Sequence, residues 1–210
     1  MFVRGVTPVW SGEQLNLFAQ KMVTLTQEPE AIDLKFKTSF GEVTGHENVY
    51  KPIIEALSKG PMKISELSKA LPSLNVGSIL QSISLLAHGN AVGFFVPDAK
   101  KKPAIQFNQV IAEAVSRGAP YRYFALPSVG SGYTLDEIQY MALDAYNKGA
   151  TTLEAMATGV EQRLKGLNKS ILREGNPVPH GEETVKELTA RLEAFVSKTL
   201  PMLKRLGGIK

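Results

Sequence analysis

The stretch that decides the fold is VGSILQSISLLAH, residues 76–88. Its apolar residues recur at spacings of three and four, which predicts a helix with one buried face: Val76, Ile79, Leu80, Ile83, Leu86 and Ala87. The Gly89-Asn90 pair that follows offers the left-handed cap on which many helices end. No Lys or Arg occurs between Lys69 and Lys100, so this helix carries no basic side chain.

Two shorter helices are predicted before it. Tyr50, Ile53, Ile54 and Leu57 form one apolar helical face, which Gly60-Pro61 ends. A second short helix spans residues 64–71 and stops at Pro72. After the third helix we expect a two-stranded ribbon: residues 91–96 as a strand, 97–103 as a basic turn and 104–107 as the returning strand. Three helices and a ribbon are the order of a winged-helix-like domain, here residues 48–107.

Two segments flank this domain. Residues 1–47 read as a mixed segment that packs on the rest, with a helix capped by Ser11 and Gln14 and a strand in which apolar residues alternate from Leu34 to Phe40. Residues 108–210 read as a helical C-terminal region. The sequence thus predicts a mainly helical α+β protein.

The C-terminal region divides into several expected helices. One spans residues 108–117, and an irregular link covers 121–133. Capping boxes at Thr134 and Thr151 open helices over 135–148 and from 151 to about 173. A stripe recurs further on at helical spacing and predicts an amphipathic helix that docks on its own chain or on a second copy: Val185, Leu188, Leu192 and Phe195.

Composition excludes several classes of protein. The chain has 210 residues and 43% hydrophobic residues, which is ordinary for a globular protein. No apolar run reaches the roughly 20 residues that span a bilayer, and the first five residues do not resemble a signal peptide. The absence of Cys excludes disulfides and thiolate chemistry and fits the cytoplasm. The formal net charge of +4 is too small to indicate nucleic acid.

Few residues offer chemistry. The three histidines, His46, His88 and His180, are far apart, so we expect no metal site. Gly130-Ser131-Gly132 precedes an expected helix, and two interpretations are open for it. It could form an anion-binding loop, or it could form a tight connector in which Gly permits a positive φ. We favour the connector and expect no cofactor.

Two basic or aromatic stretches complete the candidate sites. Tyr121-Arg122-Tyr123 either stacks on bases or buries its rings while the Arg reaches solvent. Lys100-Lys101-Lys102 either contacts phosphate at the tip of the wing or forms a solvated turn. Phosphate contacts from Lys and Arg supply most affinity for duplex DNA. Because the third helix has none, we expect this domain to bind protein rather than DNA.

Short stretches along the chain together resemble a known family. They include Phe2-Val3-Arg4-Gly5, residues 50–57, Gly60-Pro61, Ala125-Leu126-Pro127 and Gly130-Ser131-Gly132. In this order the chain resembles the regulatory region that follows the catalytic domain of certain bacterial S-adenosylmethionine-dependent methyltransferases, including enzymes similar to rickettsial-type protein lysine methyltransferases. The likeness covers residues 2–173.

The resemblance implies a non-catalytic module that regulates a methyltransferase or recognises its substrate through protein–protein contacts. Expected partners are a methyltransferase catalytic domain, a protein substrate or a second copy of the chain, and neither nucleic acid nor a membrane. The glycine-rich cofactor loop of a methyltransferase has no counterpart here, so we expect no catalysis by the chain itself. The alternative is a winged-helix DNA-binding regulator with a helical dimerisation tail.

Overall fold

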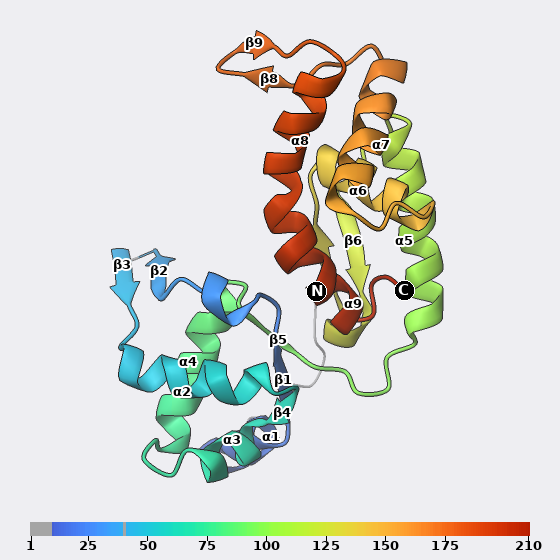
Figure 1. The fold of residues 1–210 in the computed structure, drawn as a ribbon. Helices are drawn as coiled ribbons and strands as arrows, with labels where there is room; N and C mark the ends of the chain where they lie inside the picture. Colours follow the sequence, from blue (N-terminus) through green and yellow to red (C-terminus); the bar gives the residue numbers. More distant parts are fainter. Residues whose placement is uncertain (1–9, 40) are drawn as a thin grey trace. The chain divides into compact units, whose positions relative to one another are not determined.

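The computed structural model describes residues 10–39 and 41–210, and the chain divides into two compact units, Met1–Phe95 and Val96–Lys210 (Figure 1). Each unit has a separate hydrophobic core. The expected mainly helical α+β class is confirmed. The boundary between the two units follows Phe95, whereas the sequence pattern predicted boundaries after residues 47 and 107. The first five residues, which we expect not to be a signal peptide, lie outside the described residues, as does Phe40.

The helices of the N-terminal unit follow the predicted order. They are α1 (Ser11–Ala19), α2 (Glu47–Ser58), α3 (Ile64–Ala70) and α4 (Val76–His88). The apolar faces of α2 and α4 point inward, so the side chains of Ile53, Leu57, Ile79 and Leu86 are buried. Val76 was expected on the buried face of α4, but it is exposed at the start of the helix. At the start of α4 the Asn75 side chain accepts a hydrogen bond from the N–H of Ser78 at 2.8 Å. The bounds of α4 therefore match the prediction.

The strands of this unit correct the predicted wing. One sheet has the order β4 (Met62–Lys63), β1 (Met22–Leu25), β5 (Val92–Phe94), with both pairs antiparallel. The partner of β5 is thus β1, about 70 residues earlier in the chain. The expected return strand at residues 104–107 is wrong, because these residues are helical. Pro103 lies in the first turn of this helix. A backbone N–H in that turn has no hydrogen-bond partner within the helix, so proline, which lacks the N–H, is tolerated there.

The segment before residue 47 packs only in part. Val23, Leu25 and Phe36 are buried. The strand that the alternation predicted is present as β2 (Lys35–Thr38), and it pairs with β3 (Gly41–Thr44) in a hairpin. Helix α1, in contrast, buries none of its residues. It begins at Ser11, which is therefore the first helical residue rather than the expected cap. A short 3-10 turn, Pro29–Ala31, connects β1 to the hairpin.

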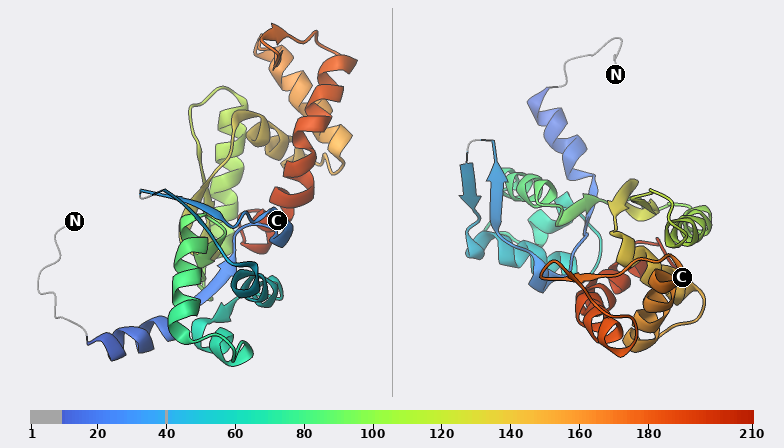
Figure 2. Two further views of the ribbon diagram at one scale, coloured as in Figure 1. Left: turned by 90° about the vertical axis from the view of Figure 1, so that its left-hand side faces the viewer. Right: turned by 90° about the horizontal axis from the view of Figure 1, so that it is seen from above.

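The C-terminal unit is a set of helices in which each packs on the next, α5 on α6, α6 on α7 and α7 on α8 (Figures 1 and 2). Their bounds are α5 (Lys101–Ser116), α6 (Glu137–Asn147), α7 (Leu153–Gly166) and α8 (Glu182–Ala194). A π-helical turn, Phe195–Thr199, joins α8 to α9 (Leu200–Arg205). Pro201 lies in the first turn of α9, so the chain continues as a helix there.

Two hairpins interrupt these helices. The expected irregular link at 121–133 is wrong, because β6 (Tyr123–Leu126) and β7 (Ser131–Thr134) pair there as an antiparallel hairpin against α5. A 3-10 turn, Pro127–Val129, connects them. The second hairpin pairs β8 (Leu172–Arg173) with β9 (Asn176–Pro177) and projects beyond the ends of α7 and α8 (Figures 1 and 2).

The helix expected from 151 to about 173 is shorter than predicted, because α7 ends at Gly166 and residues 172–173 form β8. Other helix ends also differ from the prediction. Asp136, not Thr134, caps α6, and Thr152, not Thr151, caps α7. On α8 the predicted stripe is confirmed, since Leu188, Leu192 and Phe195 are buried in the core of the same unit. None of the described helices is long and apolar enough to cross a membrane.

Candidate functional site

The three consecutive lysines do not lie in the turn of a ribbon, where the sequence pattern placed them. Lys100 precedes α5, and Lys101 and Lys102 form its first turn, where all three are exposed. The stem of Lys101 packs closely over Gly207, since a Cβ added there would lie 2.7 Å from Lys101 Cγ. Both interpretations of these lysines, a phosphate contact or a solvated turn, placed them at the tip of a ribbon, and that ribbon is not formed because Lys101 and Lys102 begin α5.

Four of the expected site residues line one groove, which we call the apolar groove. Tyr123 and Gly130-Ser131-Gly132 of the β6–β7 hairpin face Ala104 and Phe107 of α5 across a volume of about 500 Å³. No charged side chain is among its described lining residues. Phe107 is 53% exposed and Tyr123 is 74% exposed, so two aromatic rings stand in solvent at the groove.

Asn108 of α5 connects the two walls of this groove, because its side chain bonds to the β6–β7 hairpin. Its side-chain oxygen accepts a hydrogen bond from the N–H of Ala125, and its amide nitrogen donates to the carbonyls of Ala125 and Gly208, all at 2.8 Å. Asn108 is 1% exposed, so these bonds form inside the protein. One side chain on α5 thus takes the place of a neighbouring strand beside β6 and fixes the hairpin on the helix.

The same contact decides which backbone groups face outward. Ala125 directs both its N–H and its C=O toward Asn108, away from β7. In an antiparallel pair, opposite residues either exchange both hydrogen bonds or direct both groups away from each other. Gly132 is opposite Ala125, so its N–H and C=O point to the outer edge of the hairpin, beside the apolar groove.

The remaining expected residues lie elsewhere. Tyr121 and Arg122 line a separate hollow of about 570 Å³ together with Asp136, Glu137 and Lys169. Lys169 and Glu137 form an ion pair there at 2.6 Å. This hollow carries charges of both signs, unlike the apolar groove, so the aromatic and basic residues of Tyr121-Arg122-Tyr123 do not form one surface.

Of the glycine stretch, only Gly130 lies in a connector, because β7 begins at Ser131. Gly130 has a φ of 58° and its N–H donates to the carbonyl of Pro127 at 3.1 Å. Gly132 lies within β7, and α6 begins only at Glu137. A loop that leads directly into a helix N-terminus, as an anion-binding loop requires, is therefore not formed by these residues.

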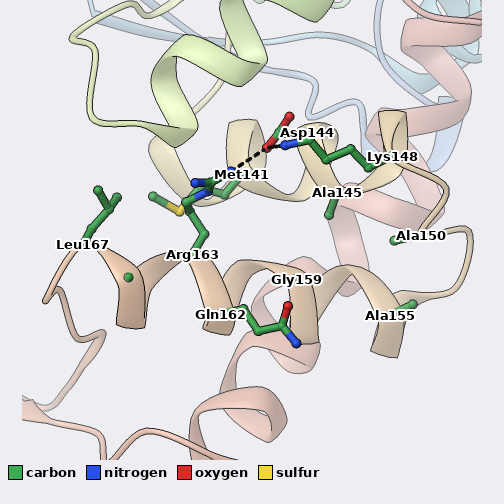
Figure 3. A pocket seen from close by; sticks show the side chains of 11 residues that line it. Met141, Asp144, Ala145, Lys148, Ala150, Ala155, Gly159, Gln162, Arg163 and Leu167 are labelled. Atoms are coloured by element: carbon green, nitrogen blue, oxygen red, sulfur yellow. Dashed lines mark hydrogen bonds and ion pairs between the residues drawn. The ribbon is translucent and has the colours of Figure 1, made fainter.

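A second groove, between α6 and α7, was not predicted from the sequence. Figure 3 shows Lys148 and Arg163 directed at Asp144 from two helices. Lys148 Nζ lies 2.7 Å and the Arg163 guanidinium 3.6 Å from the Asp144 carboxylate, which also accepts a hydrogen bond from the Ser116 hydroxyl at 2.9 Å. We call this the charged groove, and its volume is about 470 Å³. The Asp144–Lys148 spacing of four is visible in the sequence, but the contribution of Arg163 is not.

Two buried hydroxyls at or beside the hairpin, those of Ser128 and Tyr140, have no hydrogen-bond partner among the described residues. Burial raises the pKa of Tyr140 to about 12, and it also raises the pKa of Tyr133. None of the described residues offers the Tyr140 hydroxyl a hydrogen bond, while its ring packs 6.5 Å from that of Phe124. Within the described part of the chain, no group of three or more His, Asp or Glu residues is placed to hold a metal ion.

Comparison with known proteins adds one similarity. No protein-family profile matches the chain, and no solved structure matches it. The chain is 27% identical over 213 residues to the protein named "Uncharacterized protein sll1526" of Synechocystis sp., a match that covers 99% of this chain. It covers 41% of that relative, so more than half of the cyanobacterial protein lies outside the similar region.

Proposed function

We propose that this chain is a non-catalytic regulatory or substrate-recognition module of an S-adenosylmethionine-dependent methyltransferase, and that it acts through protein–protein contacts. The observation that supports this most is the apolar groove. Exposed aromatic side chains beside uncharged lining residues are typical of the centres of protein interfaces, where charged residues are depleted. A nucleic-acid surface would instead need Lys and Arg at the contact.

The partner would bind as an added strand. A segment extended along β7 would pair with the outward N–H and C=O of Gly132, and its alternate side chains would enter the groove between Phe107 and Tyr123. Main-chain hydrogen bonds then supply affinity, and the two rings select apolar side chains. The additional length of the cyanobacterial relative fits a module that works beside another domain.

The test uses that relative. The part of the Synechocystis protein outside the match is assayed for binding of S-adenosylmethionine and then for binding of this chain by calorimetry. We expect both. Phe107→Ser should weaken the second interaction about tenfold or more, since buried aromatic residues dominate such interfaces.

The control is Leu172→Ser, because Leu172 of β8 has a similar exposure of 55% and lies outside the apolar groove. If the cyanobacterial segment does not bind S-adenosylmethionine, the methyltransferase assignment is wrong. If it binds but Phe107→Ser and Leu172→Ser behave alike, the groove is not the contact surface.

A further inference from the structure

The charged groove between α6 and α7 contains more positive charge than the fold requires. Of the eleven residues drawn around it in Figure 3, one is acidic and two are basic. The Asp144 side chain is 8% exposed, so its carboxylate needs partners inside the protein. Lys148 at 2.7 Å and Ser116 at 2.9 Å already supply them.

Arg163 is the surplus cation. Its guanidinium is 3.6 Å from Asp144, which is an ion-pair distance but longer than a hydrogen bond. A guanidinium has five N–H donors in a fixed plane, and this contact uses none of them at full strength. Asp144 therefore holds Arg163 in place at the groove while leaving its donors available to a further acceptor.

The groove continues from these charges into an apolar floor. Met141 and Leu167 line it, and α7 passes close to α6 at Gly159, where an added Cβ would lie 2.8 Å from the Cβ of Ala145. A volume of about 470 Å³ falls within the range of small-molecule sites. The space combines a cationic end with a surface suited to hydrocarbon.

We propose that the charged groove binds a small organic carboxylate, whose carboxylate group is held by Arg163 and Lys148 and whose hydrocarbon part lies against Met141 and Leu167. The charge balance selects this class. Lys148, Arg163 and Asp144 together leave one positive charge, which a carboxylate neutralises. A phosphate monoester carries about −1.5 to −2 at neutral pH and would leave the groove with excess negative charge. Carboxylates also match the planar fork of an arginine.

The test titrates the full chain with acetate, hexanoate and benzoate, and follows backbone amide signals by NMR. We expect saturable shifts at Gly159, Gln162 and Gly166, with hexanoate tighter than acetate because of its hydrocarbon part. Hexanamide, which has the same length without the charge, should bind at least tenfold more weakly, because it cannot form charge-assisted hydrogen bonds with Arg163 and Lys148. Inorganic phosphate should also bind at least tenfold more weakly, because its charge exceeds the single positive charge of the groove and it has no hydrocarbon part.

Two variants and one control separate binding from folding. Arg163→Gln should weaken hexanoate about tenfold or more, whereas Lys165→Gln on the same helix removes an equal charge outside the groove and should leave binding unchanged. Gly166→Met keeps every charge and should block the groove. An added Cβ at Gly166 meets no atom within 4 Å, so this variant should fold.

Three results would overturn the proposal. They are no saturable shift at the three amides with any of the carboxylates, equal affinity for hexanoate and hexanamide, or undiminished hexanoate binding in Gly166→Met. Tighter binding of phosphate than of carboxylates would show that the groove selects a different anion. This experiment does not involve the apolar groove, so its outcome is independent of the proposed methyltransferase role.

Discussion

The two units of this protein differ in what their interiors contain. Among the residues of the N-terminal unit that the structure describes, the buried polar ones are two small hydroxyl residues, Thr24 and Ser82. The C-terminal unit buries a larger polar set that includes an amide and two carboxylates: Asn108, Ser116, Ser128, Asp144, Glu161 and Thr184. Its elements are therefore connected by specific polar bonds as well as by apolar contacts.

Several of these polar residues join segments that are distant in sequence, although the Ser128 hydroxyl has no partner among the described residues. Asn108 bonds to Gly208 across 100 residues. Glu161 of α7 accepts a hydrogen bond from the N–H of Gly181 at 3.2 Å, where α8 begins. A buried polar group costs free energy unless it is paired, so such bonds permit only one arrangement of the elements. Both grooves lie in the C-terminal unit, where this arrangement is fixed most strictly.

The largest effect is expected from Asn108→Ala. The substitution leaves the N–H and C=O of Ala125 and the C=O of Gly208 without their partner, and each unpaired buried group costs about 1–3 kcal/mol. We expect the free energy of unfolding of the C-terminal unit to fall by about 4 kcal/mol.

Hydrogen exchange would assign that loss, because amides of α5 and β6 should exchange faster while those of α4 keep their protection. Gln106→Ala is the control, since Gln106 lies on the same helix with an exposed side chain. A loss below about 1 kcal/mol in Asn108→Ala would mean that apolar packing alone positions the hairpin.

The N-terminal unit should respond to volume instead. Ile83 of α4 is 3% exposed, and Ile83→Ala should lower the free energy of unfolding of this unit by roughly 3 kcal/mol through the cavity it leaves. Leu80 was expected to be equally buried, but it is only partly buried at the edge of the core. Leu80→Ala should therefore cost less, about 1 kcal/mol. Equal losses in urea unfolding would contradict this ranking.

Local sequence patterns predicted the helices well and the pairings between distant segments badly. The stripe from Val76 to His88 is a complete amphipathic helix, so α4 is predicted with its observed bounds. Residues 104–107 were misassigned because Ile105 and Phe107 alternate with polar or small neighbours, as in a strand. The buried helical positions that follow them, Ile111 and Val115, lie outside these four residues, so the local alternation does not reveal the helix.

The grooves were less predictable still. Tyr123 and the glycine stretch were singled out as candidates, but their joining with Phe107 depends on the contact between Asn108 and Ala125, which no local pattern reveals. Arg163 reads as an ordinary surface residue of a long helix. Arg163 pairs with Asp144 because α6 and α7 approach closely at Gly159. A glycine inside the predicted helix was the only feature of the sequence that indicated such a close approach.

The smallest effect is expected where a buried polar group has no partner among the described residues. Tyr140→Phe removes a hydroxyl that is desolvated without a hydrogen bond, so at neutral pH it should leave stability unchanged or raise it by up to about 1 kcal/mol.

The dependence of stability on pH tests the burial of this hydroxyl more directly. Burial raises the pKa of Tyr140 from 10.0 to about 12, so the folded state favours the protonated phenol. The resulting stabilisation is complete below pH 10 and is lost as the pH rises toward 12. We therefore expect the unfolding free energy of the native protein to fall more steeply above pH 10 than that of Tyr140→Phe, in which Tyr133 still titrates. Parallel curves between pH 9 and pH 12, measured by urea unfolding, would show that the hydroxyl of Tyr140 is hydrated or paired in solution, and that this interior is less strictly closed than its geometry indicates.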